Sequence, residues 1–174
     1  MIRKSDSPSK IDIQLVPKTA FYTNVRSNVS KEDWDDIRKA VYKKYNYKCM
    51  ICGGKGENHP VEAHELFEYN DKIHVQKLVD IVALCPTCHS VYHIGLTTIR
   101  GSQNLAIQHL AKINNWELDK TVEYINQAFL TWKERSDHKW RLDLKYLETE
   151  FGIKDGKKMI EDKEYKETSG WGNE

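Results

Sequence analysis

The stretch that decides the fold of this 174-residue chain is LCPTCHSVYH, residues 84–93. Within it, Cys85 and Cys88 have the C-x-x-C spacing of half a zinc site. A second C-x-x-C pair, Cys49 and Cys52, lies upstream. Zinc prefers four soft ligands in a tetrahedron, and two such pairs are a common way to supply them. The sequence therefore predicts a structural Zn²⁺ site of four thiolates, with no coordination position left open.

Three histidines accompany the two cysteine pairs. His89 and His93 stand four residues apart, which on a helix places both side chains on one face, one turn apart. His64 lies between the cysteine pairs, in a segment at 61–67 that we expect to be a strand. The chain combines a zinc knuckle, a strand with a histidine and a C-x-x-C-H-x-x-x-H helix. This combination indicates more than a purely structural zinc site.

The order and spacing of these residues resemble the HNH family of endonucleases, whose ββα-metal motif is carried on such a scaffold. The resemblance implies an α+β fold: a ββα-metal core with structural zinc, an N-terminal helix and a C-terminal helical extension. It also implies that His64, His89 and His93 bind a catalytic divalent ion, Mg²⁺ or another. Such an ion stabilises the charge that develops on the phosphate, while a neutral histidine deprotonates the attacking water.

The end of the first expected strand departs from the family pattern. The family usually has a ligand followed by a base histidine, and this chain has His64 followed by Glu65. If His64 is the ligand, Glu65 falls at the base position, where a carboxylate with a pKa of about 4.3 is a weak base unless desolvated. If His64 is the base, Ala63 takes the ligand position and contributes nothing. Adjacent strand residues point to opposite faces, so His64 and Glu65 cannot share one environment without a twist or bulge.

Asp80 falls where the family has an Asn that helps to orient the base histidine. It could accept a hydrogen bond from an imidazole N–H, and it fits an ordinary exposed acid at a strand end equally well. We keep His64 as the key residue and leave Glu65 undecided. The catalytic set that the resemblance implies is thus His64, Glu65, Asp80 and His89.

Composition is that of a soluble globular protein, with 39% hydrophobic and 30% charged residues. No apolar run approaches membrane-spanning length, and the N-terminus lacks the apolar core of a signal peptide. Without a secretion signal, the cysteine spacing favours metal binding over two disulfides. We expect a cytoplasmic protein without membrane contact, and a free-standing chain of this size resembles a phage or mobile-element protein in a bacterial host.

The formal net charge of +1 means that contacts with nucleic acid must come from local groups of cations. Lys and Arg gather at 38–48 and at 133–141, although both stretches also fit solvated helix faces. We expect Lys48, Lys55 and Arg100 to contact nucleic acid. The family resemblance makes DNA the expected partner, and the sequence does not decide between DNA and RNA.

Apolar periodicity and turn residues organise the chain into an N-terminal tail and arm (1–28), a zinc-knuckle core (29–100), a helical extension (101–150) and a charged C-terminal tail (151–174). The expected elements are an extended segment at 11–16, helices at 30–45, 86–95, 105–116 and 119–132, strands at 61–67 and 78–84 around a polar loop at 68–76, and a strand-like or single-turn segment at 140–144.

Three functions are compatible with this pattern. The leading hypothesis is a metal-dependent HNH-type endonuclease acting on DNA. The second is a degenerate HNH-like zinc module that holds nucleic acid or a host protein, for example as a phage inhibitor of host defence. Glu65, Asp80 and the near-neutral net charge motivate it. The third is a purely structural zinc protein, which predicts widely separated histidines. The sequence does not fix the oligomeric state.

Overall fold

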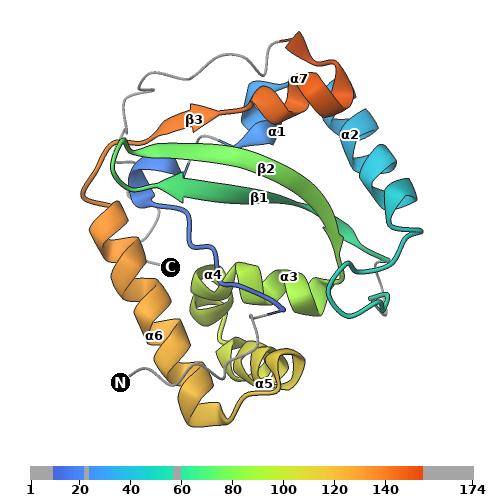
Figure 1. Cartoon of the computed structure of the whole chain (residues 1–174). Coiled ribbons are helices and arrows are strands. Elements are labelled where there is room, and N and C mark those ends of the chain that lie inside the picture. Colours follow the sequence, from blue (N-terminus) through green and yellow to red (C-terminus); the bar gives the residue numbers. More distant parts are fainter. Residues whose placement is uncertain (1–9, 22–23, 57–59, 155–174) are drawn as a thin grey trace.

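The computed structural model of the chain describes residues 10–21, 24–56 and 60–154, so the first nine residues and most of the expected C-terminal tail lie outside it. These residues form a three-stranded mixed sheet and seven α-helices, an α+β fold as the sequence predicted. Helices cover both faces of the sheet (Figure 1).

The sheet is built on one long hairpin. Strands β1 (Glu62–Asn70) and β2 (Val75–Leu84) pair antiparallel, and the short β3 (Arg141–Asp143) pairs parallel to β2. The prediction of a polar loop at 68–76 is wrong, because only residues 71–74 lie outside the paired strands β1 and β2. Gln76, polar but 1% exposed, lies inside the sheet opposite Tyr69. A polar residue buried in a strand is easily predicted to lie in a loop when only residue type is considered.

One face of the sheet packs on α1 (Val25–Asn28), α2 (Lys31–Lys44) and α7 (Lys145–Phe151). Ser30 begins α2 as predicted, since its hydroxyl accepts a hydrogen bond from the Asp33 N–H at 3.0 Å. The apolar side chains that this face buries include Ile37, Val41, Leu78, Ile81 and Leu147. The sequence did not predict α7, because its apolar pattern is short and its apolar side chains are buried only by contact with the sheet.

The opposite face packs on α3 (Pro86–Tyr92), and α4 (Ile94–Ile99), α5 (Gln103–Asn114) and α6 (Leu118–Arg135) extend the same core on this side. The helix expected at 86–95 is divided at His93, which ends α3 and precedes α4. Buried residues of this second core include Val82, Leu84, Val91, Ile94 and Leu110. In the ranges that the structure describes, no helix combines the length and apolarity needed to cross a bilayer.

The N-terminal arm joins this second face to the helical extension. Asn114 of α5 accepts hydrogen bonds from the backbone N–H groups of Lys10 (2.8 Å) and Ile11 (3.2 Å), and its amide donates to the Ile11 carbonyl. Further along, the Trp132 indole of α6 donates to the Val16 carbonyl at 2.9 Å. Ile11 itself is completely buried. The arm therefore acts as an extended strap that packs in the core without joining the sheet.

We predict that Ile11→Ala lowers the free energy of unfolding by about 2–5 kcal/mol, the usual cost of truncating a buried aliphatic side chain. Urea denaturation followed by tryptophan fluorescence measures it. Ile73→Ala is the matched control, because Ile73 is 56% exposed and its truncation should change little. Equal stability of the two variants would show that the arm does not contribute to the core.

Candidate functional site

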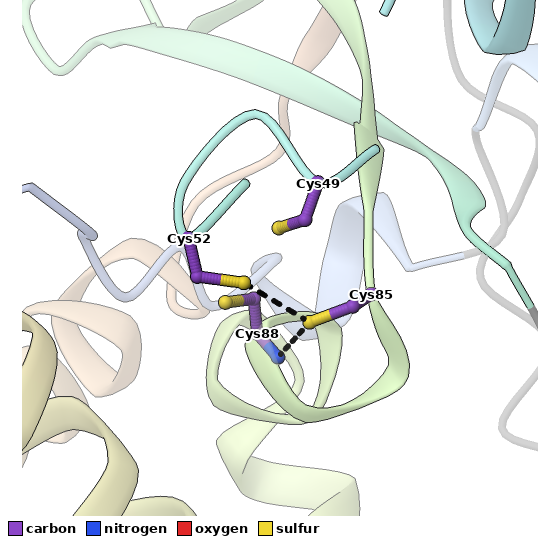
Figure 2. A group of neighbouring side chains, drawn as sticks. All are labelled: Cys49, Cys52, Cys85 and Cys88. Carbon is purple, nitrogen blue, oxygen red and sulfur yellow. Dashed lines mark hydrogen bonds between the residues drawn. The ribbon is translucent and has the colours of Figure 1, made fainter. Parts of the chain in front are cut away.

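Two turns bring four cysteines together. Cys49 and Cys52 lie in the turn that follows α2, while Cys85 and Cys88 open α3, and the four sulfurs lie within 4.8 Å of one another (Figure 2). The Sγ atoms of Cys52 and Cys85 are 3.6 Å apart. A tetrahedron with Zn–S bonds of about 2.3 Å has edges of about 3.8 Å. The cluster therefore suggests the zinc site that the spacing predicted.

Backbone contacts fix both turns. Gly53 has a φ of +70°, a left-handed conformation that favours glycine, and its N–H donates to the Cys49 carbonyl at 2.9 Å. The Met50 N–H donates to the carbonyl of Ala83 at 2.8 Å, which joins the knuckle to the end of β2. On the other side, the Cys85 sulfur accepts the Cys88 N–H and so caps α3. Cys85 therefore follows the last residue of β2, caps α3 and directs its sulfur into the cysteine cluster.

Electrostatics favour a cation among the thiols. The pKa of Cys49 is lowered to about 4, chiefly because the Cys88 thiol donates a hydrogen bond to its thiolate. The pKa of Cys88 is raised by the same hydrogen bond, and then by burial and by the neighbouring sulfurs. A second thiolate is therefore costly while the four sulfurs share only protons. A bound Zn²⁺ removes this conflict, since it allows all four to be deprotonated.

Three imidazoles form a second cluster, from β1 and the end of α3. Ligand nitrogens of His64, His89 and His93 lie within 4.8 Å of one another, and the Nε2 atoms of His89 and His93 are 3.0 Å apart. The His64 ring centroid is 5.0 Å from each of the other two. The sequence predicted this trio, and the structure brings it together at a place where it could hold a metal ion.

His64 supplies the sharpest sign of a missing ligand. Its ring is 8% exposed, and its Nε2 atom is buried without a hydrogen-bond partner in the described part of the chain. An unsatisfied buried polar atom costs about 1–3 kcal/mol. Tyr92, 4% exposed, packs against the ring at 4.6 Å between centroids and limits its rotation. A coordinated cation would satisfy this nitrogen where it stands.

Glu62 is a site residue that the sequence analysis missed. Its carboxylate contacts Nδ1 of His89, which leaves Nε2 of that ring facing His93. A carboxylate on the far nitrogen fixes the tautomer and orientation of a metal-binding histidine and raises its basicity. The signal was present, because Glu62 precedes His64 by two residues and the two therefore share one face of β1.

The pKa values of two of the imidazoles, His64 and His93, are lowered. Burial, and then the charges of His93 and His89, lower the pKa of His64 well below 6.5. His93 is exposed as a residue, yet desolvation of its ring, and then the charge of His89, lower its pKa to about 4. Metal binding needs the neutral form of imidazole. The cluster is therefore ready for a cation at neutral pH without first losing protons from these two rings.

The structure does not bring Glu65 to the imidazoles. Its Oε1 accepts the Val25 N–H at 2.7 Å, at the start of α1, and burial raises its pKa. Alternation along β1 places it on the face opposite His64, as the sequence analysis required of adjacent residues. Glu65 therefore bonds to α1 in the core on the opposite face of the sheet.

Asp80 is also directed elsewhere. It lies beside a β-bulge that interrupts regular alternation next to Leu66. Its Oδ1 accepts the Tyr146 hydroxyl of α7 at 2.6 Å and lies 3.4 Å from the Lys44 ammonium of α2. It therefore connects helices of the opposite face rather than orienting a histidine.

The expected nucleic-acid contacts remain available. Lys48, Lys55 and Arg100 are all exposed, and the charge of Arg100 contributes to the low pKa of His93, which places its guanidinium near the histidine cluster. Several cations of the two basic stretches are instead paired with acids: Arg38, Lys39, Lys44 and Arg135. These stretches are thus partly neutralised, whereas the charge of Arg100 is felt at His93.

Comparisons of the chain with models of protein families, with curated proteins and with solved structures found no match.

We predict that the purified protein binds one tightly held zinc at the cysteine cluster, and that Cys88→Ser loses it with a large fall in melting temperature. Structural zinc contributes about 10–16 kcal/mol of binding free energy in small zinc domains. Elemental analysis and thermal denaturation measure both effects. His89→Ala is the control and should keep this zinc. Full stability of Cys88→Ser without zinc would exclude a structural role for the metal.

With the histidine cluster free of metal, acid should destabilise the fold between about pH 6.5 and about pH 4, the ordinary and the folded pKa of His93. In this range the unfolded imidazole binds a proton that the folded one does not, so the free energy of unfolding rises with pH. Urea denaturation at a series of pH values measures the slope, which His93→Gln should reduce. An NMR titration that places the pKa of His93 near 6.5 would contradict this.

Proposed function

We propose that the chain is a metal-dependent endonuclease of the HNH type that hydrolyses phosphodiester bonds in DNA. The observation that carries the proposal is the convergence of His64, His89 and His93, with a buried, unpartnered His64 nitrogen among them. They come from the first strand of a hairpin and from the helix that follows it, with four cysteines at the helix start. This order of elements is that of a ββα-metal motif with a zinc knuckle.

The donor set favours some ions over others. Imidazole nitrogen suits Zn²⁺, Ni²⁺ and similar transition metals, whereas Mg²⁺ prefers oxygen ligands in an octahedron. Nitrogen ligands about 2.0–2.1 Å from zinc are about 3.3 Å from one another in a tetrahedron. The 3.0 Å between the Nε2 atoms of His89 and His93 is close to this value. Of the divalent ions expected from the sequence, a transition metal therefore fits these residues better than Mg²⁺ does.

Each residue near the cluster has a distinct role in this proposal. When bound, the divalent ion supplies a Lewis acid that stabilises negative charge on the phosphate and its leaving oxygen. His64, His89 and His93 hold it, and Glu62 fixes the orientation of His89. Arg100, exposed beside His93, neutralises a neighbouring phosphate of the backbone. The zinc cluster holds the helix that carries two of the three imidazoles.

The positions of Glu65 and Asp80 favour a second candidate. Both carboxylates are committed to α1, α2 and α7, and neither reaches the imidazoles. A chain in which they have left the catalytic set could keep the ion and bind nucleic acid or a host protein without cutting. Salt-insensitive capture of a protein partner, with no cleavage under any divalent ion, would support this second function.

Under the nuclease proposal, protein loaded with Zn²⁺, Mn²⁺ or Ni²⁺ should nick supercoiled plasmid. His64→Ala and His89→Ala should reduce the rate by about a hundredfold or more, as removal of groups that stabilise transition-state charge does. Gel electrophoresis of the plasmid gives the rate. Glu65→Gln should still cut, because its carboxylate contacts α1 and not the cluster.

His74→Ala, prepared in the same way, is the matched histidine control, since His74 stacks on His138 at the hairpin turn and lies outside the trio. It should retain the full rate. Undiminished cleavage by both His64→Ala and His89→Ala would remove the proposal, and loss of cleavage in Glu65→Gln alone would return the base role to that carboxylate.

A further inference from the structure

Cys88 differs from the other three cysteines in its surroundings. It is 0% exposed and lies inside α3, whereas Cys52 is exposed to solvent. Four thiolates around Zn²⁺ carry two negative charges in excess, and such charge in a protein interior needs hydrogen-bond donors. The need is greatest at the sulfur that water cannot reach.

The other sulfurs have donors in the chain or in solvent. Backbone N–H groups of Cys52, Cys85 and Ile51 point at the Cys49 sulfur. The Cys88 N–H donates to Cys85 at 3.5 Å. Water can reach Cys52. Backbone donors therefore serve the knuckle and the helix cap, which are the parts of the site where N–H groups are not needed for helix hydrogen bonds.

Cys88 has no such backbone supply, because N–H groups further along α3 donate to carbonyls of the helix, as His89 does to Cys85. A side chain of another element reaches it instead. Nε2 of His109, on α5, is 3.1 Å from the Cys88 sulfur. We propose that His109 donates its Nε2–H to the Cys88 thiolate and is a positioning residue of the zinc centre, outside the metal's own ligands.

The geometry separates this role from that of a ligand. The four sulfurs alone complete a tetrahedron within 4.8 Å. An imidazole that donates Nε2–H carries its proton on that nitrogen, and this nitrogen then has no lone pair for zinc. The inference depends on zinc at the cysteines and not on nuclease activity, so it can hold or fail independently of the proposed function.

The hydrogen bond gives α5 a direct connection to the metal. The same helix holds the N-terminal arm through Asn114, which bonds Lys10 and Ile11. Binding of zinc therefore stabilises α5, and with it the arm, through a single side chain.

Zinc affinity tests the proposal. His109→Phe, which keeps a ring and removes the N–H, should weaken zinc binding about 10–100-fold, the usual effect of losing a partner of a metal ligand. His109→Gln, which can still place an N–H near the sulfur, should recover most of this loss. Gln108→Leu, exposed on the same helix, is the control and should bind zinc as the unchanged protein does. Competition with a chromophoric chelator measures all four proteins.

A spectroscopic measurement on the unchanged chain keeps the test decisive if His109→Phe fails to fold. In cadmium-substituted protein, NMR should detect a scalar coupling between the metal and the imidazole Hε2 of His109, transmitted through the Cys88 sulfur. A one-bond coupling from cadmium to the imidazole nitrogen would instead make His109 a ligand and overturn the proposal. Unchanged zinc affinity in His109→Phe would overturn it as well.

Discussion

The requirement of four converging thiols for a cation is the constraint on which the rest of this structure depends. The sulfurs lie within 4.8 Å of one another, and the ionisation of Cys49 makes that of Cys88 less favourable. A tetrahedral Zn²⁺ would resolve the conflict and at the same time join three elements. The knuckle follows α2 and is bonded to the end of β2 through Met50, and Cys85 caps α3. A zinc ion there would therefore hold the start of α3 against the end of the hairpin, alongside the apolar contacts of the same core.

The geometry of the histidine cluster follows from the position of the cysteine cluster in two steps. A helix capped at Cys85 carries His89 and His93 on the face one turn beyond the metal, and the alternation of β1 turns His64 toward them. The same alternation sends Glu65 to the opposite core, where its carboxylate accepts the first N–H of α1. One strand therefore divides its polar residues between a site that could hold a metal and a helix cap, and a register shift of one residue would exchange them.

The sequence could predict features that depend on residues close together in the chain, and it could not predict those that depend on distant residues. Both clusters were predictable, because zinc-knuckle spacing and the four-residue spacing of a helix act over a few residues. Glu62 could have been found by the two-residue period of a strand. Asp80 could not, since a bulge decides its direction and its partners, Tyr146 and Lys44, lie on helices remote in sequence. The contact of His109 with Cys88 spans 21 residues and depends on how α5 packs against α3, which no local pattern encodes.

The histidine cluster costs stability, which favours a ligand-binding role for it over a role in the core. Burial lowers the pKa of His64, and one nitrogen of its ring lacks any partner among the described residues. Two imidazole nitrogens 3.0 Å apart, one ring oriented by Glu62, make a poor core and a good ligand set. An apolar residue at His64 would pack with Tyr92 at lower cost. A fold that keeps this arrangement beside the cysteine cluster accepts local destabilisation, as is common where residues are arranged to hold a ligand.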